Sequence, residues 1–305
     1  MIRRWRRILL ISLGVILCLV VLVFLTGTLA LRGSLARLDG TVNLAGLDNP
    51  VTITRDDLGV PDIHAASRTD AARALGYLHG QDRFFQMDMM RRNSAGELAE
   101  LMGPALLGTD RRHRPHQFRS RARAVMDRAS SEDLGLLAAY AEGVNSGLED
   151  LRTRPFEYLF LRTKPEPWLP EDTILTLYSM FLDLSFSTVS DERNWALVRD
   201  NLPPEVAEFL LPRSSHWEAP LQTEAVPGID IPDSSEVDVR RWTYSGMSYD
   251  RFRAYEDSVS RHDNSGSNNW AVAGHLSGHG GALVANDMHL GISLPNTWYR
   301  VRMSW

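Results

Sequence analysis

The stretch Ser265-Gly266-Ser267-Asn268-Asn269-Trp270 places a serine directly after a glycine, at the beginning of a predicted strand. Glycine leaves its own carbonyl unshielded and tolerates strained backbone angles. The Ser267 hydroxyl is therefore suited to attack the Gly266 carbonyl, and hydrolysis of the resulting ester would free Ser267 with its own α-amine. An α-amine has an ordinary pKa of about 7.7–8, which suits a general base. The pattern predicts a nucleophile and a base in one residue, although the hexapeptide taken alone is more typical of a turn.

Two predicted strands follow this serine, at residues 270–273 and 282–285, and the glycine-rich residues 274–281 are typical of a turn between them. Before the serine, residues 213–264 show no sustained hydrophobic period, which predicts a linker-like segment. The alternative is an irregular but packed lobe, because this stretch contains tryptophans. Residues 297–305 are strand-like and stop inside an apolar pattern, so we expect the protein to continue further.

Most of the chain before residue 213 is predicted to be helical. Ser67 is a typical N-cap, with Asp70 at the capping-box position, for a helix that reaches Arg92. Asp82 falls on the apolar stripe of that helix, so its carboxylate is expected at the edge of the core or paired with an arginine from elsewhere. Further helices are predicted at 132–151, 171–185, 192–201 and 204–211, and short β-rich stretches at 41–44 and 51–54.

Motifs far apart in the sequence carry a family resemblance. They are Asp57-Leu58-Gly59-Val60-Pro61-Asp62-Ile63-His64-Ala65, then Ala74-Leu75-Gly76-Tyr77-Leu78-His79-Gly80-Gln81-Asp82-Arg83-Phe84-Phe85-Gln86-Met87-Asp88, Arg91-Arg92, Gly96-Glu97-Leu98-Ala99-Glu100-Leu101-Met102-Gly103, and finally Gly266-Ser267-Asn268-Asn269-Trp270-Ala271-Val272. In this order they closely resemble the penicillin acylase (penicillin amidase) family of N-terminal nucleophile hydrolases. The resemblance runs from about residue 40 to the end of the chain.

The resemblance implies an α+β protein with the four-layer αββα fold, which would be incomplete here. It also implies a precursor cut into two subunits: a mostly helical α-subunit at 32–213, a spacer peptide at 214–266, and a β-subunit that starts at 267, of which 267–305 is present. The implied activity is hydrolysis of a linear carboxamide of the penicillin, cephalosporin or acyl-homoserine lactone type, with release of an acyl group. The oxyanion-hole residues of the family would lie beyond residue 305, so we expect this chain alone to be inactive.

The same resemblance implies roles for individual residues. His289 would lie beside the amine of the nucleophile, whereas a surface histidine after a strand is the open alternative. Phe181, Leu184 and Ser185 would line the acyl pocket, although Phe181 and Leu184 could equally belong to a helix core. Asp191 would be a ligand of a structural calcium ion, and a helix N-terminal acid stabilised by the helix dipole explains it equally well. No organic cofactor is implied.

Composition excludes several other classes of protein. The 305 residues are 44% hydrophobic with a net charge of −5, so a charge excess suited to nucleic acid is absent. Lys164 is the only lysine, and neither a P-loop nor a Ser–Lys dyad is present. The single cysteine, Cys18, excludes intrachain disulfides and Cys-rich zinc sites. His275 and His279 have a ligand-like spacing, but they lie among glycines rather than on a helix.

The N-terminus predicts a membrane anchor. Arg3, Arg4, Arg6 and Arg7 precede 24 uncharged, mostly aliphatic residues at 8–31, more than the roughly 20 needed to cross a bilayer. The arginines are expected to stay in the cytoplasm, which puts the remainder on the extracytoplasmic side. We therefore predict a transmembrane signal-anchor at 1–31, with a cleaved signal peptide as the alternative.

Two further functional classes compete with an amidase. A non-catalytic, membrane-anchored binding protein on the same scaffold is one, but loss of catalysis would more commonly show as a replaced nucleophile, and Ser267 is present. A Ser–His–acid hydrolase is the other, and no Gly-x-Ser-x-Gly elbow supports it. The predicted partners are a small acyl-amide substrate, the rest of the β-subunit and the membrane.

Overall fold

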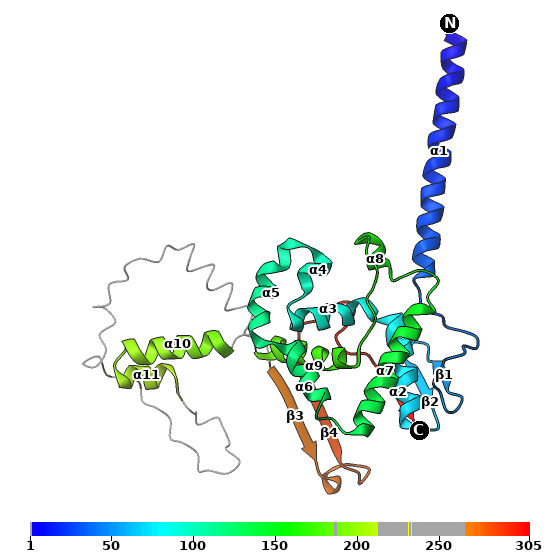
Figure 1. Ribbon diagram of the computed structural model, residues 1–305. Coiled ribbons are helices and arrows are strands. Elements are labelled where there is room, and N and C mark those ends of the chain that lie inside the picture. The colour runs from blue at the N-terminus through cyan, green and yellow to red at the C-terminus, as the bar shows by residue number, and fades with distance from the viewer. Residues whose placement is uncertain (1, 186–187, 213–230, 232, 234–265) are drawn as a thin grey trace. The chain divides into compact units, whose positions relative to one another are not determined.

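The structure is a computed structural model that describes residues 2–185, 188–212, 231, 233 and 266–305. The predicted spacer at 214–266 lies almost entirely outside the described residues. The chain divides into two compact units, Met1–Leu182 with Ser293–Trp305, and Asp183–Ile292. We call these the first and the second unit (Figure 1).

Helix α1 (Ile2–Gly33) is long and apolar enough to cross a membrane, and in the part of the chain that the structure describes it alone passes that test. Its leucines and valines are exposed, since none of its most apolar stretch is buried among the described residues. The last turn of α1 is held by Thr153, whose hydroxyl donates to the Ala30 carbonyl (2.7 Å) and whose N–H donates to the Gly33 carbonyl (3.0 Å).

The body of the first unit is helical, with a small sheet. Its helices are α2 (Arg68–Asp82), α3 (Phe84–Ala95), α4 (Leu98–Met102), α5 (Leu107–His113), α6 (Phe118–Met126), α7 (Ser131–Glu149), α8 (Phe156–Phe160) and α9 (Pro170–Ser185), whose last residues pass into the second unit. The second unit contains α10 (Thr188–Asn201), α11 (Pro204–Leu210) and the strands β3 (Gly266–Val272) and β4 (Leu283–His289). The expected helices at 132–151, 171–185, 192–201 and 204–211 are confirmed to within four residues at each end.

The sheet of the first unit has the order β1-β2-β5 and joins distant parts of the sequence. Strand β1 (Thr52–Arg55) pairs antiparallel with β2 (Pro61–His64), and β2 pairs in parallel with β5 (Arg302–Ser304). Ile63 at its centre is fully buried. The expected strand at 41–44 is wrong, because those residues form an extended loop whose Val42 and Leu44 side chains pack on the same core as Ile63.

The predicted helix from Ser67 to Arg92 is interrupted once. Ser67 caps α2 as expected, with its side chain accepting from the Asp70 N–H. At Arg83 the backbone leaves helical angles (φ −140°, ψ 5°), and α3 starts at the next residue. The Arg83 guanidinium donates to the Asn296 carbonyl (3.2 Å). The residue that interrupts the helix therefore contacts a segment near the C-terminal end of the chain, and local helix preference does not decide its conformation.

Asp82 is paired with an arginine from elsewhere, as the sequence predicts. Arg55 Nη2 lies 2.8 Å from Asp82 Oδ2, and the Tyr299 hydroxyl donates to the same oxygen over 2.6 Å. Burial, then the charge of Asp82, raises the pKa of the Tyr299 hydroxyl, which keeps its proton for this bond. The hydrogen bond from Tyr299 therefore joins α2 to a segment that follows Ser267 in the sequence.

Helices α2 and α7 pack with their backbones unusually close. A Cβ atom added at Gly76 would lie 2.2 Å from the Tyr140 carbonyl oxygen, and one at Gly80 would lie 2.2 Å from that of Val144. Gly143 and Gly147 of α7 face α2 backbone carbonyls in the same way, at 2.1 Å. Glycines four residues apart on both helices therefore set their separation.

Gly80→Ala is expected to lower the free energy of unfolding by about 1–3 kcal/mol, because the new methyl group meets a backbone oxygen that cannot move aside. Gly135→Ala is the matched control, since Gly135 lies on α7 and nothing stands within 4 Å of its added Cβ. That variant is expected to be neutral or slightly more stable. Urea unfolding of both variants measures the difference, and equal midpoints would contradict the close helix contact.

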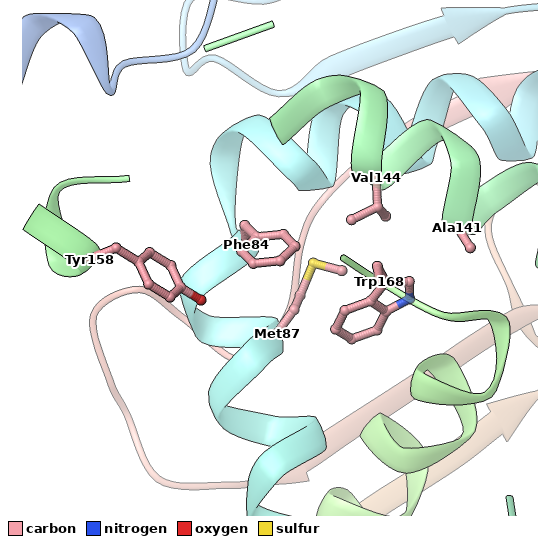
Figure 2. Close-up of a cluster of buried hydrophobic side chains, with 6 residues drawn as sticks. All are labelled: Phe84, Met87, Ala141, Val144, Tyr158 and Trp168. Carbon is pink, nitrogen blue, oxygen red and sulfur yellow. The ribbon is translucent and has the colours of Figure 1, made fainter. Parts of the chain in front are cut away.

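The main hydrophobic cluster lies where α3, α7, α8 and the segment before α9 meet (Figure 2). It consists of Phe84, Met87, Ala141, Val144, Tyr158 and Trp168. The Phe84 and Trp168 rings meet edge to face, with centroids 6.5 Å apart. Tyr158 is fully buried and extends its hydroxyl to Asp88, so this cluster borders a buried group of charges.

These charges form a buried ion network of Asp88, Arg91, Arg92, Arg119 and Asp172. Asp88 Oδ1 accepts from Nε of Arg91 (2.7 Å) and of Arg92 (2.9 Å). Asp172 accepts from Arg91 (2.6 Å) and from Arg119 (3.3 Å). Asp88 and Asp172 are almost completely buried. The network therefore connects α3 to α6 and α9 through charges that are shielded from water.

Candidate active site

The predicted nucleophile lies on the β3–β4 hairpin of the second unit. The two strands pair antiparallel over seven residues each, from Gly266 opposite His289 to Val272 opposite Leu283. Strands at 270–273 and 282–285 are thus confirmed, and both extend further than expected, toward Gly266 and His289. The sequence signal missed this extension because Ser267, Asn268 and Asn269 are poor strand formers.

The turn of this hairpin depends on its glycines. A Cβ atom at Gly274 would lie 2.3 Å from the Gly280 carbonyl oxygen, and Gly280 itself has a φ of +75°. The Ser277 hydroxyl bridges the turn through the carbonyls of Gly274 (3.0 Å) and Gly281 (2.6 Å). His275 and His279 belong to this turn, and His279 Nδ1 accepts from the Gly281 N–H. Glycine backbone geometry and local side-chain hydrogen bonds of Ser277 and His279 therefore account for the turn.

The register brings three predicted site residues together. The His289 backbone lies directly opposite Gly266, and Ser267 lies opposite Met288. Directly opposite residues in an antiparallel pair have Cα atoms about 4.5–5.5 Å apart. The Ser267 side chain is exposed. The His289 side chain lies outside the described residues. The peptide bond expected to break therefore lies at the first pair of the ladder, next to the backbone of the expected catalytic histidine.

Phe181, Leu184 and Ser185 occupy the last turn and a half of α9. Phe181 is 53% and Leu184 56% exposed, whereas Leu175, Ser179 and Leu182 form the buried face of the same helix. The Phe181 ring lies edge-on to that of Phe118, with centroids 6.2 Å apart. Neither apolar side chain belongs to the helix core, so both are available to line a binding surface. Phe181 lies in the first unit, and Leu184 and Ser185 lie in the second.

Asp191 lies in the first turn of α10. Its side chain is outside the described residues, and its place in the helix suits both a dipole-stabilised acid and a calcium ligand. Within the residues that the structure does describe, no three His, Cys, Asp or Glu side chains are grouped to hold a metal ion.

Comparison with known proteins identifies the family. The sequence model of the penicillin amidase family matches residues 50–305. This range includes the motifs at 57–103, the motif at 266–272 and the β3–β4 hairpin. The chain belongs to the penicillin amidase family. The resemblance to that family is thereby confirmed over residues 50–305.

Curated relatives from this family are proenzymes and acylases. Penicillin acylase 2 proenzyme from Pseudomonas sp. is 29% identical over 269 residues, which is 88% of this chain and 34% of that protein. Acyl-homoserine lactone acylase QuiP from Pseudomonas aeruginosa is 30% identical over 276 residues, 88% of this chain and 31% of that protein. The chain thus spans about a third of the length of these penicillin amidase relatives.

Among solved structures, a chain of thermostable penicillin G acylase from Alcaligenes faecalis is 27% identical, with a TM-score of 0.46 over 59% of this chain and 97% of that chain.

The family motifs before residue 110 have structural tasks that the sequence reasoning did not assign. Gly76 and Gly80 permit the α2–α7 contact, and Arg91 and Arg92 belong to the buried ion network. Glu97 extends this network, since its Oε2 lies 2.5 Å from Nη2 of Arg119. The four-residue spacing of these glycines is the sequence signal for this close helix packing.

Proposed function

We propose that this chain is the N-terminal part of an amidase precursor that cuts itself before Ser267 and then hydrolyses a linear carboxamide. The proposal is carried by one observation: the penicillin amidase match includes Gly266-Ser267 at the first pair of the β3–β4 ladder. The mature protein would consist of an α-subunit at 32–213 and a β-subunit from 267, with 214–266 removed. Together the subunits would form the four-layer αββα fold, of which the described residues supply a helix-rich portion with small sheets.

The self-cleavage needs only groups of this chain and water. The Ser267 hydroxyl oxygen attacks the Gly266 carbonyl, the C–N bond breaks, and the acyl group moves from nitrogen to oxygen as the amine gains a proton. Water then hydrolyses the ester, leaving a carboxylate on Gly266 and an α-amine on Ser267. Exposure of Ser267 gives water access to this bond.

The released amine serves the second reaction. It accepts the proton of the Ser267 hydroxyl while the oxygen attacks a substrate carbonyl, and it returns the proton to the leaving amine. Water then hydrolyses the acyl-enzyme ester and releases the acid. The matched proteins are named as acylases for penicillin and for acyl-homoserine lactone. We infer a substrate that is an acyl amide with an apolar acyl group, because the exposed Phe181 and Leu184 are apolar.

Sequencing the N-termini of the purified, mature full-length protein tests the proposal. A new chain that begins at Ser267, together with release of an acid from a phenylacetyl, aliphatic acyl-homoserine lactone or cephalosporin-type amide, is the expected result. A protein that remains one chain and binds these amides without hydrolysis would instead support the non-catalytic binding protein.

His289→Ala is expected to lower kcat of the processed enzyme by about tenfold or more, equivalent to ~1.4 kcal/mol of transition-state stabilisation. The reason is its position opposite Gly266, beside the amine that must accept the proton. Single-turnover kinetics and thermal unfolding on the same preparation provide the measurement. A drop in kcat that merely matches a small loss of stability would assign His289 to the surface instead.

For Asp191 we propose a role as ligand of a structural calcium ion, on the basis of the family resemblance. Asp191→Ala should then reduce the bound calcium per molecule and slow the appearance of the cut chains. A helix N-terminal role alone predicts a stability loss of about 0.5–2 kcal/mol that is the same with calcium and with chelator. Metal analysis of the wild-type and variant precursors decides between the two, and an unchanged calcium content rejects the ligand role.

We further propose that α1 spans the cytoplasmic membrane, with Arg3 and its neighbouring arginines in the cytoplasm and the body on the extracytoplasmic side. Three features support this: the length of α1, its exposed apolar side chains and the basic N-terminus.

A further inference from the structure

Helix α8 exposes two aromatic rings on the surface of the first unit. Phe160 is 75% and Phe156 45% exposed, and their rings meet edge to face with centroids 6.2 Å apart. Tyr158, between them in sequence, is fully buried in the main hydrophobic cluster. The helix is therefore fixed to the core on one side, while its other side presents aromatic surface to the surroundings.

The residues around these rings are basic. Residues 152–164, which we call the α8 segment, contain Arg152, Arg154, Arg162 and Lys164 but only one acid, Glu157. The protein as a whole carries a net charge of −5, so the positive charge of this segment is a local property. Cations beside exposed aromatic rings are typical of surfaces that rest on membranes, because the rings enter the lipid and the cations meet anionic headgroups.

Two of these cations, one from each side of α8 in the sequence, line a cavity of about 360 Å³ together with residues of α7. Arg154 and Lys164 lie on its wall with Leu148 and Pro165, and Glu149 is its one acidic residue. Arg154 Nε is buried and has no hydrogen-bond partner among the described residues. A guanidinium and an ammonium on the wall of one cavity suit a phosphate group.

The α8 segment is also attached to the proposed membrane anchor. Thr153 lies three residues before Phe156, and it makes both hydrogen bonds to the last turn of α1, at Ala30 and Gly33. A side chain added at Gly33 would collide with Thr153 at 2.9 Å, so the contact is tight. If α1 crosses the bilayer, its last turn lies at the boundary between lipid and water, and the α8 segment is held beside that boundary.

We propose that the α8 segment docks on the extracytoplasmic surface of the membrane, with Phe156 and Phe160 inserted in the lipid and Arg154 and Lys164 binding the phosphate of an anionic phospholipid. This inference rests on the proposed anchoring by α1. It adds a second point of contact, which would fix the orientation of the body above the bilayer. A single helix joined to a body leaves that orientation unspecified.

Nitroxide labelling of the full chain in lipid nanodiscs tests the docking. In a Cys18→Ser background, the label is placed at Phe160→Cys or, as a control, at Leu58→Cys, which is 81% exposed on the turn between β1 and β2. The label at 160 is expected to be severalfold more accessible to oxygen than to a water-soluble nickel complex, whereas the label at 58 should show the reverse. The oxygen preference at 160 should be larger in phosphatidylcholine with phosphatidylglycerol than in phosphatidylcholine alone.

A double variant tests the headgroup site. Arg154→Gln with Lys164→Gln should remove the effect of phosphatidylglycerol on the label at 160, whereas Arg111→Gln with Arg112→Gln, two exposed cations of α5, should leave it unchanged. A label at 160 that is as water-accessible as the label at 58, or an unchanged lipid effect in the Arg154/Lys164 variant, overturns this inference alone. A chain that does not enter the nanodiscs overturns the anchoring proposal, and this inference with it.

Discussion

The full-length Ser267→Ala precursor is expected to persist as one uncut chain without amidase activity. The substitution removes the only atom that can attack the Gly266 carbonyl in the proposed mechanism, while the backbone ladder to β4 needs no side chain at this position. Mass spectrometry of the purified protein measures the outcome directly. Two chains with a break before residue 267 in this variant would show that another group, or a protease, makes the cut.

Two further variants separate cleavage from catalysis. Ser267→Cys retains a nucleophile and is expected to allow the cut, but its larger sulfur atom should reduce amide hydrolysis more than it slows processing. Gly266→Val crowds the attacked carbonyl and should slow processing, yet the chain that begins at Ser267 is unchanged once it is released. An equal slowing of cleavage and turnover by Gly266→Val would contradict this division of roles.

Asp88→Ala is expected to cost about 3–5 kcal/mol of unfolding free energy, the typical effect of breaking a buried ion pair. The loss leaves Nε of Arg91 and of Arg92 and the Tyr158 hydroxyl without their acceptor, in a region where water does not replace it. Urea denaturation of the full chain provides the measurement.

An exposed ion pair supplies the control. Arg68 and Glu132 lie 3.6 Å apart with most of both side chains in water, so Glu132→Ala should change stability by only about 0–1 kcal/mol. Similar losses for Asp88→Ala and Glu132→Ala would mean that burial of the network has no energetic consequence.

Local patterns predicted much of the helical body. Ser67 caps α2 as expected, because an N-cap is encoded within a few residues. Asp82 is paired with an arginine, as its place on the apolar stripe of the helix suggested. The break at Arg83 has no signal in the local sequence, and the Arg83 side chain there contacts the Asn296 carbonyl, more than two hundred residues away. The same is true of the burial of Asp172 on α9, which is paired with Arg91 of α3 and Arg119 of α6.

For the candidate site, the sequence predicted more of the chemistry than of the geometry. The Gly266-Ser267 pair shortly before a strand could be predicted from residue types, but the extension of β3 to Gly266 could not. The register that sets His289 opposite Gly266 could not, because a shift of one residue is equally compatible with the apolar pattern on this exposed hairpin. Roles assigned to Phe181, Leu184, Ser185 and Asp191 depend on the family resemblance and remain predictions.

The parallel pairing of β2 with β5 has a consequence for assembly. Ile63 and Met303 lie on opposite sides of the proposed cut, so a single polypeptide forms this pair as an intramolecular contact. A covalent connection holds two segments at an effective concentration far above that of separate chains in a cell. Once the chain is cut, that advantage is gone, and a dissociated pair would have to find each other by diffusion. We therefore expect the precursor to be the species that folds, and two subunits made separately to assemble slowly and incompletely.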